Sequence, residues 1–499
     1  MVKLSTKNTV FALVKETTEG TPVAPSAATD FVAFQEGFSV SPSFTELTNT
    51  ELQSSIGTPK SALGFEEPTA SVSHYVRHSG VEGQEPNFKH LLEAALGAKS
   101  VNATERTTDA GSTTSVIELT AGGTDFERGK AVLVKDATNG YSIRNVLSVS
   151  TDSLTLAQNI ANAPAAGINV GKCVNYAVAN SGHPTLDLWT YRANGGATEL
   201  MAGTRVTDMT IDITAGDFIN GSFTLSGIKY FFDPITISAT NKFIDFDDAG
   251  GEENVSVAEK TYKDPYELAA AIETAMNGAT LDTITVTYDD AARKFTIASD
   301  GATLSLLWNT GTNTANSIGA TLGFSVAADD TGSLTYTSDD AQDWSAAYTP
   351  EYDDNDPLIA KSNTILIGEA DEITCFGAQS VSIALSNTKT DITDVCSESG
   401  KSGSQFTGRT VNIDVVAYLE QGQAEEFKRY RNNDEIQFCY NAGVKSGGNW
   451  VPGKAVNFFS PTCKISSFAL GDGDGIVTLE MSLQCFVADG LGEFYINFL

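Results

Sequence analysis

The chain is poor in cysteine and has no long hydrophobic run. Its six cysteines are scattered over 499 residues, five of them from Cys375 onward, which excludes a disulfide scaffold and fits reduced thiols in a cytosol. No run approaches 18 apolar residues, and the N-terminus lacks the apolar core of a secretion signal. We therefore expect neither a membrane span nor a cleaved signal.

Positive charge is also scarce. The chain has 31 Lys and Arg against 63 Asp and Glu, a net charge of −32. So acidic a protein repels phosphate backbones, which excludes DNA binding through a basic patch. At 499 residues with 41% hydrophobic content, the chain is too long for one core and apolar enough for several domains.

Motifs of catalysis and metal binding are missing. Of only four histidines, His74 and His78 lie four apart on an expected strand, about 13 Å from each other and too far to share a zinc ion. The acidic segment 471–475 falls between two expected strands, which favours a hairpin turn over a calcium loop. Phosphate-binding glycine loops and nucleophile elbows are absent, and adjacent acids are expected by default in this composition. We predict no enzyme and no catalytic, cofactor or metal residues.

What the chain does have is a long internal repeat. Residues 38–52 align without a gap with residues 381–395, at an offset of 343. Phe65 and Val72 then match Phe406 and Ile413 at an offset of 341, and Phe88-Lys89 of one predicted helix match Phe427-Lys428 of another at 339. Three matches in the same order indicate a duplicated module. Four positions of the first match are identical: Ser39/Ser382, Ser43/Ser386, Thr45/Thr388 and Thr50/Thr393.

The last strands of the two modules match at an offset of only 257, with Val206 opposite Cys463. The drop of 82 residues predicts an insertion in the first module, residues 99–182, whose alternating segments and Asn139-Gly140 turn indicate a small all-β domain. Residues 231–345 contain one clear helix that begins at Asp264 with a capping box, and an alternating hairpin that turns at Asp289-Asp290. This block is predicted to be a small α+β domain.

These matches define five predicted regions. The fold class is mainly β, with two tandem β-sandwich modules that each carry one helix, plus the two inserted domains. The regions are an N-terminal arm, 1–30; the first module, 31–98 and 183–230; the β insertion, 99–182; the α+β domain, 231–345; and a linker with the second module, 346–499.

This arrangement resembles the major tail tube protein of long, non-contractile-tailed bacteriophages. The resemblance is carried by residues 10–52 and by the second module, residues 377–485, and both insertions lie outside it; the block 231–342 looks like a decoration unit of phage tails and other extracellular filaments. It implies a structural virion protein of the tail, assembled in the host cytoplasm, whose rings stack into a hollow tube for passing double-stranded DNA. With two modules in each chain, a ring of three chains would be pseudo-hexameric. Tape-measure and tail terminator or tip proteins are the further partners that the resemblance implies, and no cofactor is implied.

The resemblance assigns roles to three sets of residues. Segments 45–66 and 388–407 would brace one ring against the next, with these candidates: Glu46, Glu51, Leu52, Ile56, Pro59, Lys60, Leu63, Asp391, Asp394 and Lys401. Acids facing the lumen would repel DNA, with these candidates: Glu46, Glu51, Asp212, Asp391, Asp394 and Asp414. The densest basic cluster, Lys428, Arg429 and Arg431, is either a solvated helix face or a contact with an acidic patch of a neighbouring subunit.

Two other functions fit the composition. A phage fibre or cell-surface adhesin would use the insertions and the four tryptophans, Trp189, Trp308, Trp344 and Trp450, to bind glycans. A polysaccharide-degrading enzyme with unrecognised carboxylates is the other alternative.

Overall fold

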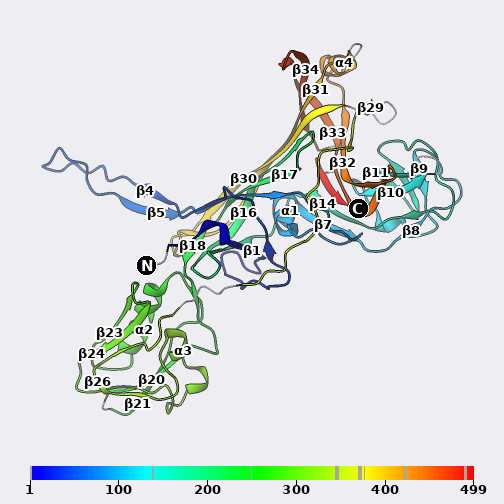
Figure 1. The fold of residues 1–499 in the computed structure, drawn as a ribbon. Helices are drawn as coiled ribbons and strands as arrows, with labels where there is room; N and C mark the ends of the chain where they lie inside the picture. The colour runs from blue at the N-terminus through cyan, green and yellow to red at the C-terminus, as the bar shows by residue number, and fades with distance from the viewer. Residues whose placement is uncertain are drawn as a thin grey trace.

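Strands dominate the computed structural model, which confirms the mainly β fold (Figure 1). The structure describes residues 3–136, 140–248, 250–342, 348–368, 374–375, 377–420, 424–487 and 492–499. Eighteen strands belong to one large sheet system, and the smaller sheets lie in the two insertions and in one hairpin. The core of the large system contains side chains from both predicted modules.

The first module is a two-layer unit around the long bent strand β16. The C-terminal half of β16 pairs with β17, β17 pairs with β6, and β6 pairs with β3. The N-terminal half of β16 pairs with β15 and β18, and β15 pairs with β1. The elements are η1 (Thr6–Asn8), β1 (Val10–Lys15), β2 (Phe31–Val32), β3 (Ser39–Ser41), β6 (Thr69–Tyr75), α1 (Lys89–Leu96), β15 (Leu186–Arg192), β16 (Ala197–Thr214), β17 (Asn220–Ser226) and β18 (Lys229–Phe232).

The second module pairs its strands in the same order around β33. The C-terminal half of β33 pairs with β34, β34 with β31, and β31 with β30. Its N-terminal half pairs with β32 and β35, and β32 pairs with β28. The elements are β28 (Thr364–Gly368), β29 (Thr374–Cys375), β30 (Ala378–Thr393), β31 (Lys401–Tyr418), α4 (Glu425–Asn432), β32 (Ile436–Ser446), β33 (Asn449–Gly473), β34 (Ile476–Cys485) and β35 (Tyr495–Phe498).

The repeat extends further than the sequence match. Residues 199–202 of β16 pair with β18, and residues 456–459 of β33, which lie 257 positions later, pair with β35. The C-terminal strand β35 is therefore the counterpart of β18. The same comparison makes β1 the counterpart of β28, because β1 pairs with β15 as β28 pairs with β32.

The two modules share one continuous sheet. Residues 208–214 of β16 pair with residues 380–386 of β30, so the eight strands run in the order β3-β6-β17-β16-β30-β31-β34-β33. All seven pairings are antiparallel. One face of this sheet packs on the core through residues such as Ile211, Ile383 and Ile413, and the other face carries polar side chains.

Part of the predicted N-terminal arm is a core strand. Residues 10–14 of β1 are buried between two clusters, with Phe11 and Leu13 in the main core and Val10, Ala12 and Val14 in another. The run of five apolar residues fits a strand that is buried on both faces. The surrounding Thr, Pro and Ala residues obscured this signal.

The β insertion is smaller than predicted. Strands β7 (Gly97–Asn102) and β14 (Cys173–Val178) pair with each other and β14 pairs with β35, so both belong to the large sheet system. They have no counterpart in the second module, which is why the sequence offset broke before them. A six-stranded sheet with its own core remains, built from β8 (Arg106–Thr107), β9 (Val116–Glu118), η2 (Gly123–Asp125), β10 (Ala131–Asp136), β11 (Gly140–Ser150), β12 (Ser153–Leu156) and β13 (Asn169–Val170). Asn139 of the predicted turn lies outside the described residues.

The block that follows β18 has a separate apolar core. The Asp264 carboxylate accepts from the Glu267 backbone N–H, which confirms the predicted N-cap, but the Glu267 carboxylate accepts from Lys263 and not from the Asp264 N–H of a standard capping box. The predicted hairpin is β23 and β24. The elements are β19 (Ile235–Thr236), β20 (Phe243–Asp247), β21 (Glu252–Ser256), β22 (Thr261–Tyr262), α2 (Pro265–Asn277), β23 (Ile284–Asp289), β24 (Lys294–Ser299), β25 (Leu304–Leu306), η3 (Thr314–Asn316), α3 (Gly319–Leu322), β26 (Asp330–Ser333) and β27 (Thr335–Thr337).

The helices of the two modules also form where predicted. In α1 the apolar side chains Leu91, Leu92 and Leu96 are buried, and Gly97 ends the helix with a φ of 99°, in the left-handed region that favours glycine. Helix α1 begins at Lys89, three residues later than a helix opened by Pro86, and Lys89 N–H donates to the Pro86 carbonyl in the turn before it.

Candidate assembly surface

The exposed face of the eight-stranded sheet alternates carboxylates with hydroxyls. Across neighbouring strands the sheet places Asp212 beside Ser382, Ser382 beside Asp414, and Asp414 beside Ser482. The Ser382 hydroxyl donates to Asp212 at 2.7 Å, and the Ser482 hydroxyl donates to Asp414 at 2.6 Å. The two carboxylates lie on strands two apart, about 10 Å from each other. The intervening serines therefore keep like charges separated while the face stays acidic.

Two further acids on this face were missed by the sequence analysis. Asp208, four residues before Asp212 on β16, accepts a hydrogen bond from Ser386 at 2.7 Å, and Glu480 is exposed on β34. The alternation of β16 and β34 could have indicated both. Of the six predicted lumen acids, only Asp212 and Asp414 lie on this face, and the other four belong to the two hairpins described below.

The sheet ends at two edges that are open within the described residues. Residues 466–473 of β33 pair with β34 on one side, and no described strand pairs with their other side. At the opposite end, β3 pairs with β6 alone. In the internal repeat, β33 corresponds to β16 and β3 corresponds to β30. Strands β16 and β30 pair with each other inside the chain. Open edges present unpaired N–H and C=O groups, which another strand can pair with.

The first hairpin projects from the body of the molecule (Figure 1). It consists of β4 (Phe44–Leu47) and β5 (Ala62–Glu66), which pair only with each other. Side chains along it are exposed, with Leu52 and Ile56 at 102% and 111%. Each of the predicted stacking residues from Glu46 to Leu63 lies on this hairpin. Apolar side chains this exposed mark an interaction site.

The second hairpin, the tip of β30 and β31, lies against the first module of the same chain. Lys401 is 2% exposed and forms ion pairs with Asp391 at 2.7 Å and with Glu67 at 3.5 Å. Burial opposes ionisation of Asp391, but hydrogen bonds from Lys389 and Lys401 hold the pKa of its carboxyl below the ordinary value. Asp394 caps the turn by accepting from the Cys396 N–H. Asp391 and Lys401, predicted to contact another ring, are thus engaged within the chain.

No protein-family model matches the sequence, and no curated protein matches it either. Among solved structures, a chain of the SPP1 tail tube aligns with 28% of this chain and 77% of its own length, at 19% identity and a TM-score of 0.21. A chain from the virion of a native gene transfer agent aligns with 25% of this chain and 92% of its own length, at 14% identity and a TM-score of 0.19. Both alignments are partial, so the function proposed below rests on the strands and surfaces of this chain.

The predicted basic cluster on α4 is partly buried. Arg429 is 3% exposed at its side chain and lies near Glu425 and Glu426, while Lys428 pairs with Glu425 at 3.1 Å. Of the three, only Arg431 is exposed and forms no ion pair with another described residue. The face that α4 leaves exposed is aromatic, since Phe427 and Tyr430 lie at the surface and pack on Phe468 of β33.

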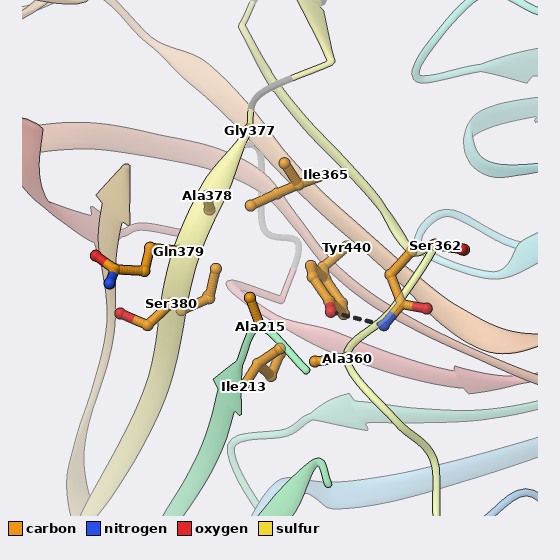
Figure 2. A pocket seen from close by; sticks show the side chains of 12 residues that line it. Ile213, Ala215, Ala360, Ser362, Ile365, Gly377, Ala378, Gln379, Ser380 and Tyr440 are labelled. Carbon is orange, nitrogen blue, oxygen red and sulfur yellow. Dashed lines mark hydrogen bonds between the residues drawn. The ribbon is translucent and has the colours of Figure 1, made fainter. Parts of the chain in front are cut away.

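A cavity of about 250 Å³ lies where the two modules meet, between β16, β28 and β30 (Figure 2). Its lining is mostly apolar and includes Ile213, Ala215, Ile365 and Ala378, and its one titratable side chain is Tyr440. Burial raises the pKa of Tyr440 to about 12, and its hydroxyl accepts a hydrogen bond from Asn363 at 2.8 Å. Its other polar side chains are amides and serine hydroxyls, and no carboxylate, imidazole, amine or thiol lines the cavity.

The remaining candidates do not form a site either. His74 and His78 are buried, and burial lowers the pKa of both imidazoles, that of His74 to about 4. The described residues contain no group of three or more potential ligands placed to hold a metal ion. Residues 471–473 end β33, and Asp474 and Gly475 form the turn to β34, so this segment is part of a hairpin as predicted. Among the helices of the described residues, none is long and apolar enough to cross a membrane.

Proposed function

We propose that this chain is a structural protein of a bacteriophage tail that assembles with copies of itself into rings, which stack into a tube. The observation that carries the proposal is the eight-stranded sheet. Inside the chain, the last strand of the first half, β16, pairs with the first strand of the second half, β30. The last strand of the second half, β33, and the first strand of the first half, β3, are the equivalent edges and are left open.

Repeating the β16–β30 junction between chains, as β33 against β3, would pair both open edges. Closure of a sheet into a ring is the one arrangement that removes every edge strand. Helix α4 does not obstruct this pairing, because its counterpart α1 packs against β16 while β16 pairs with β30. In the phage family that the sequence resembles, the ring has six modules, so three chains with two modules each would complete it.

The polar face of the sheet would then line the bore. Asp208, Asp212, Asp414 and Glu480 would meet the DNA phosphates with like charge, and a ring of three chains carries −96 in total. Repulsion of this kind lets DNA slide without adhering. Tape-measure and tail terminator or tip proteins would be the partners at the bore and at the ends of such a tube.

Electron microscopy of the purified protein after negative staining tests the proposal. We expect hollow, regularly striated tubes or isolated rings. A protein that stays monomeric at high concentration and binds glycans would contradict it and favour a fibre or adhesin. That alternative has little support in the structure, because Trp189, Trp308 and Trp450 are all buried and offer no platform for a sugar, and Trp344 lies outside the described residues.

A further inference from the structure

We propose that the β4–β5 hairpin of one chain seats in a cavity on the second module of the neighbouring chain in the same ring. The inference rests on the proposed ring and names a partner surface within it. The resemblance to tail tube proteins led us to expect that this hairpin contacts the next ring along the tube. The internal repeat of the chain points to the lateral neighbour.

The second hairpin supplies the template for this contact. Its tip seats on the strand segment 65–67 of the first module. The Ser399 carbonyl accepts from the Glu66 N–H at 3.4 Å, and the Lys401 ammonium lies 3.5 Å from the Glu67 carboxylate. Gly400 passes so close to Phe65 that an added Cβ would lie 2.3 Å from the ring. Along the same hairpin, Lys389 donates to the Gly227 carbonyl at 3.4 Å.

Each residue of this seat has a counterpart in the second module. The offset of 341 that relates β6 to β31 places Phe406, Thr407 and Gly408 at the positions of Phe65, Glu66 and Glu67. β18 pairs with β16 as β35 pairs with β33, and this makes Lys229 the counterpart of Tyr495. Glu493 therefore stands at the position of Gly227.

In the second module these counterparts line an open cavity of about 300 Å³. The remaining lining residues are Arg409, Asn387, Ala179, Asn180 and His183. Asn387 is 4% exposed, yet its side-chain Oδ1 has no hydrogen-bond partner within the described chain, and neither has Arg409 Nε. Both atoms are enclosed by the chain itself, since Asn387 also donates to the carbonyls of Ala95 and Val206 and Arg409 also donates to Glu493. The case for a second chain in this cavity therefore rests on its match to the seat in the first module.

The hairpin of a second copy is the segment that the internal repeat places at this cavity. Thr58, Pro59 and Lys60 stand at the positions of Ser399, Gly400 and Lys401, by the same offset of 341. Proline cannot adopt the φ of +75° that Gly400 has, so the turn of this hairpin differs from the template, and only the strand contact of Thr58 is carried over. Lys60 is exposed, whereas Lys401 is buried in its seat. If β3 of one chain pairs with β33 of its neighbour, the β4–β5 hairpin that follows β3 lies over the second module of that neighbour. Within one chain, the tip of β30 and β31 lies over the first module in the same way. The geometry of the template then places Thr58 beside Thr407.

Cysteine cross-linking tests this contact. The variant Thr58→Cys with Thr407→Cys is made in a background of Cys375→Ser and Cys396→Ser, assembled, oxidised and run on a denaturing gel without reductant. Residues whose backbone N–H and C=O groups bond across a strand pair lie close enough for a disulfide. The matched control is Ser399→Cys with Glu66→Cys, which should form a bond within one chain and leave its mass unchanged.

A lateral contact in a ring of three gives covalent dimers and trimers and nothing larger, and this is the result we expect. A ladder that continues beyond three chains would show that the hairpin contacts the next ring, and would overturn the inference while leaving the tube intact. Tubes without any cross-link would overturn it as well. Failure to assemble at all, in the unsubstituted protein under the microscope, would instead contradict the proposed function, and the inference with it.

Discussion

The two hairpins of this protein begin in matching sequence and end in different surroundings. The β30–β31 tip lies against the first module, where its lysine at position 401 is buried and paired with carboxylates. The β4–β5 hairpin projects with its apolar side chains exposed (Figure 1). The difference follows from position in the chain, because only the second hairpin has another module in front of it. The first module thus holds a hairpin against its surface, and the second module has no such contact within the chain described.

The two module helices differ in the same direction. Phe88 of α1 is 2% exposed, while its counterpart Phe427 of α4 is 49% exposed. Helix α1 is covered by strands β1, β7 and β14. Strands β7 and β14 frame the β insertion, and the second module has no equivalent of them. The exposure of α4 is therefore explained by strands β7 and β14, which only the first module has. It does not by itself indicate that a neighbouring chain covers α4.

The largest effect is expected at the junction between the modules. Ile383 on β30 is fully buried where β30 pairs with β16, and Ile383→Ala should lower the free energy of unfolding by about 2–4 kcal/mol because it leaves a cavity. Val40, its counterpart on the open strand β3, is only partly buried, and Val40→Ala should cost less than about 1 kcal/mol in the monomer. Urea denaturation of both variants measures the contrast, and equal losses would refute it.

The lysines of the two hairpins offer the next test. Lys401→Ala removes the buried partner of Asp391 and should cost about 2–3 kcal/mol, with faster proteolysis of the hairpin tip. Lys60→Ala, at the equivalent exposed position, should change the monomer by less than about 0.5 kcal/mol. Chemical denaturation of the two variants measures the difference, and a loss of similar size from Lys60→Ala would contradict it.

A buried carboxyl gives the modules different pH responses. In β15, Asp187 is fully buried near Glu16, whereas the equivalent position of β32 holds Cys439. Burial and the neighbouring Glu16 raise the pKa of Asp187 to about 9. Because the folded pKa exceeds the unfolded one, the unfolded chain binds fewer protons between about pH 4 and 9, and stability falls as pH rises through that window.

Asp187→Asn should remove this dependence. The amide keeps an acceptor for the Val23 N–H, which now donates to Asp187 at 2.6 Å, and can donate to Glu16. We expect a gain of about 1–2 kcal/mol at pH 8 and a smaller difference at pH 5, measured by chemical denaturation at both pH values. A larger gain at pH 5 than at pH 8 would show that the sign is wrong.

The smallest effect on stability is expected on the polar face of the sheet. Asp212→Asn and Asp414→Asn should each change the free energy of unfolding by less than about 0.5 kcal/mol, because both side chains are exposed and bonded to a serine. If this face lines the bore, the double variant should slow DNA passage from assembled particles without altering tube formation. Unchanged passage would remove the role of these acids.

Sequence alone captured what repeats and missed what does not. The matches at Phe65 and Phe406 and at Phe88 and Phe427 located the modules, because apolar periodicity survives duplication. The strand β1 was missed because the Thr, Pro and Ala residues around it obscured its apolar run. It is related to its counterpart β28 by strand pairing, since β1 pairs with β15 as β28 pairs with β32. Docking of the second hairpin was equally invisible, since the contact of Lys401 with Glu67 joins residues 334 positions apart. Ion pairs over such separations follow from the folded topology and leave no local signal.

The most direct test of the account is the number of chains in one ring. Native mass spectrometry of rings released from the tubes should give three chains, because each chain supplies two equivalent halves of the sheet and one junction between them. Cryo-electron microscopy of the same rings should place β33 of one chain beside β3 of the next. A ring of six chains, or a ring of three in which β33 and β3 remain unpaired, would contradict the account.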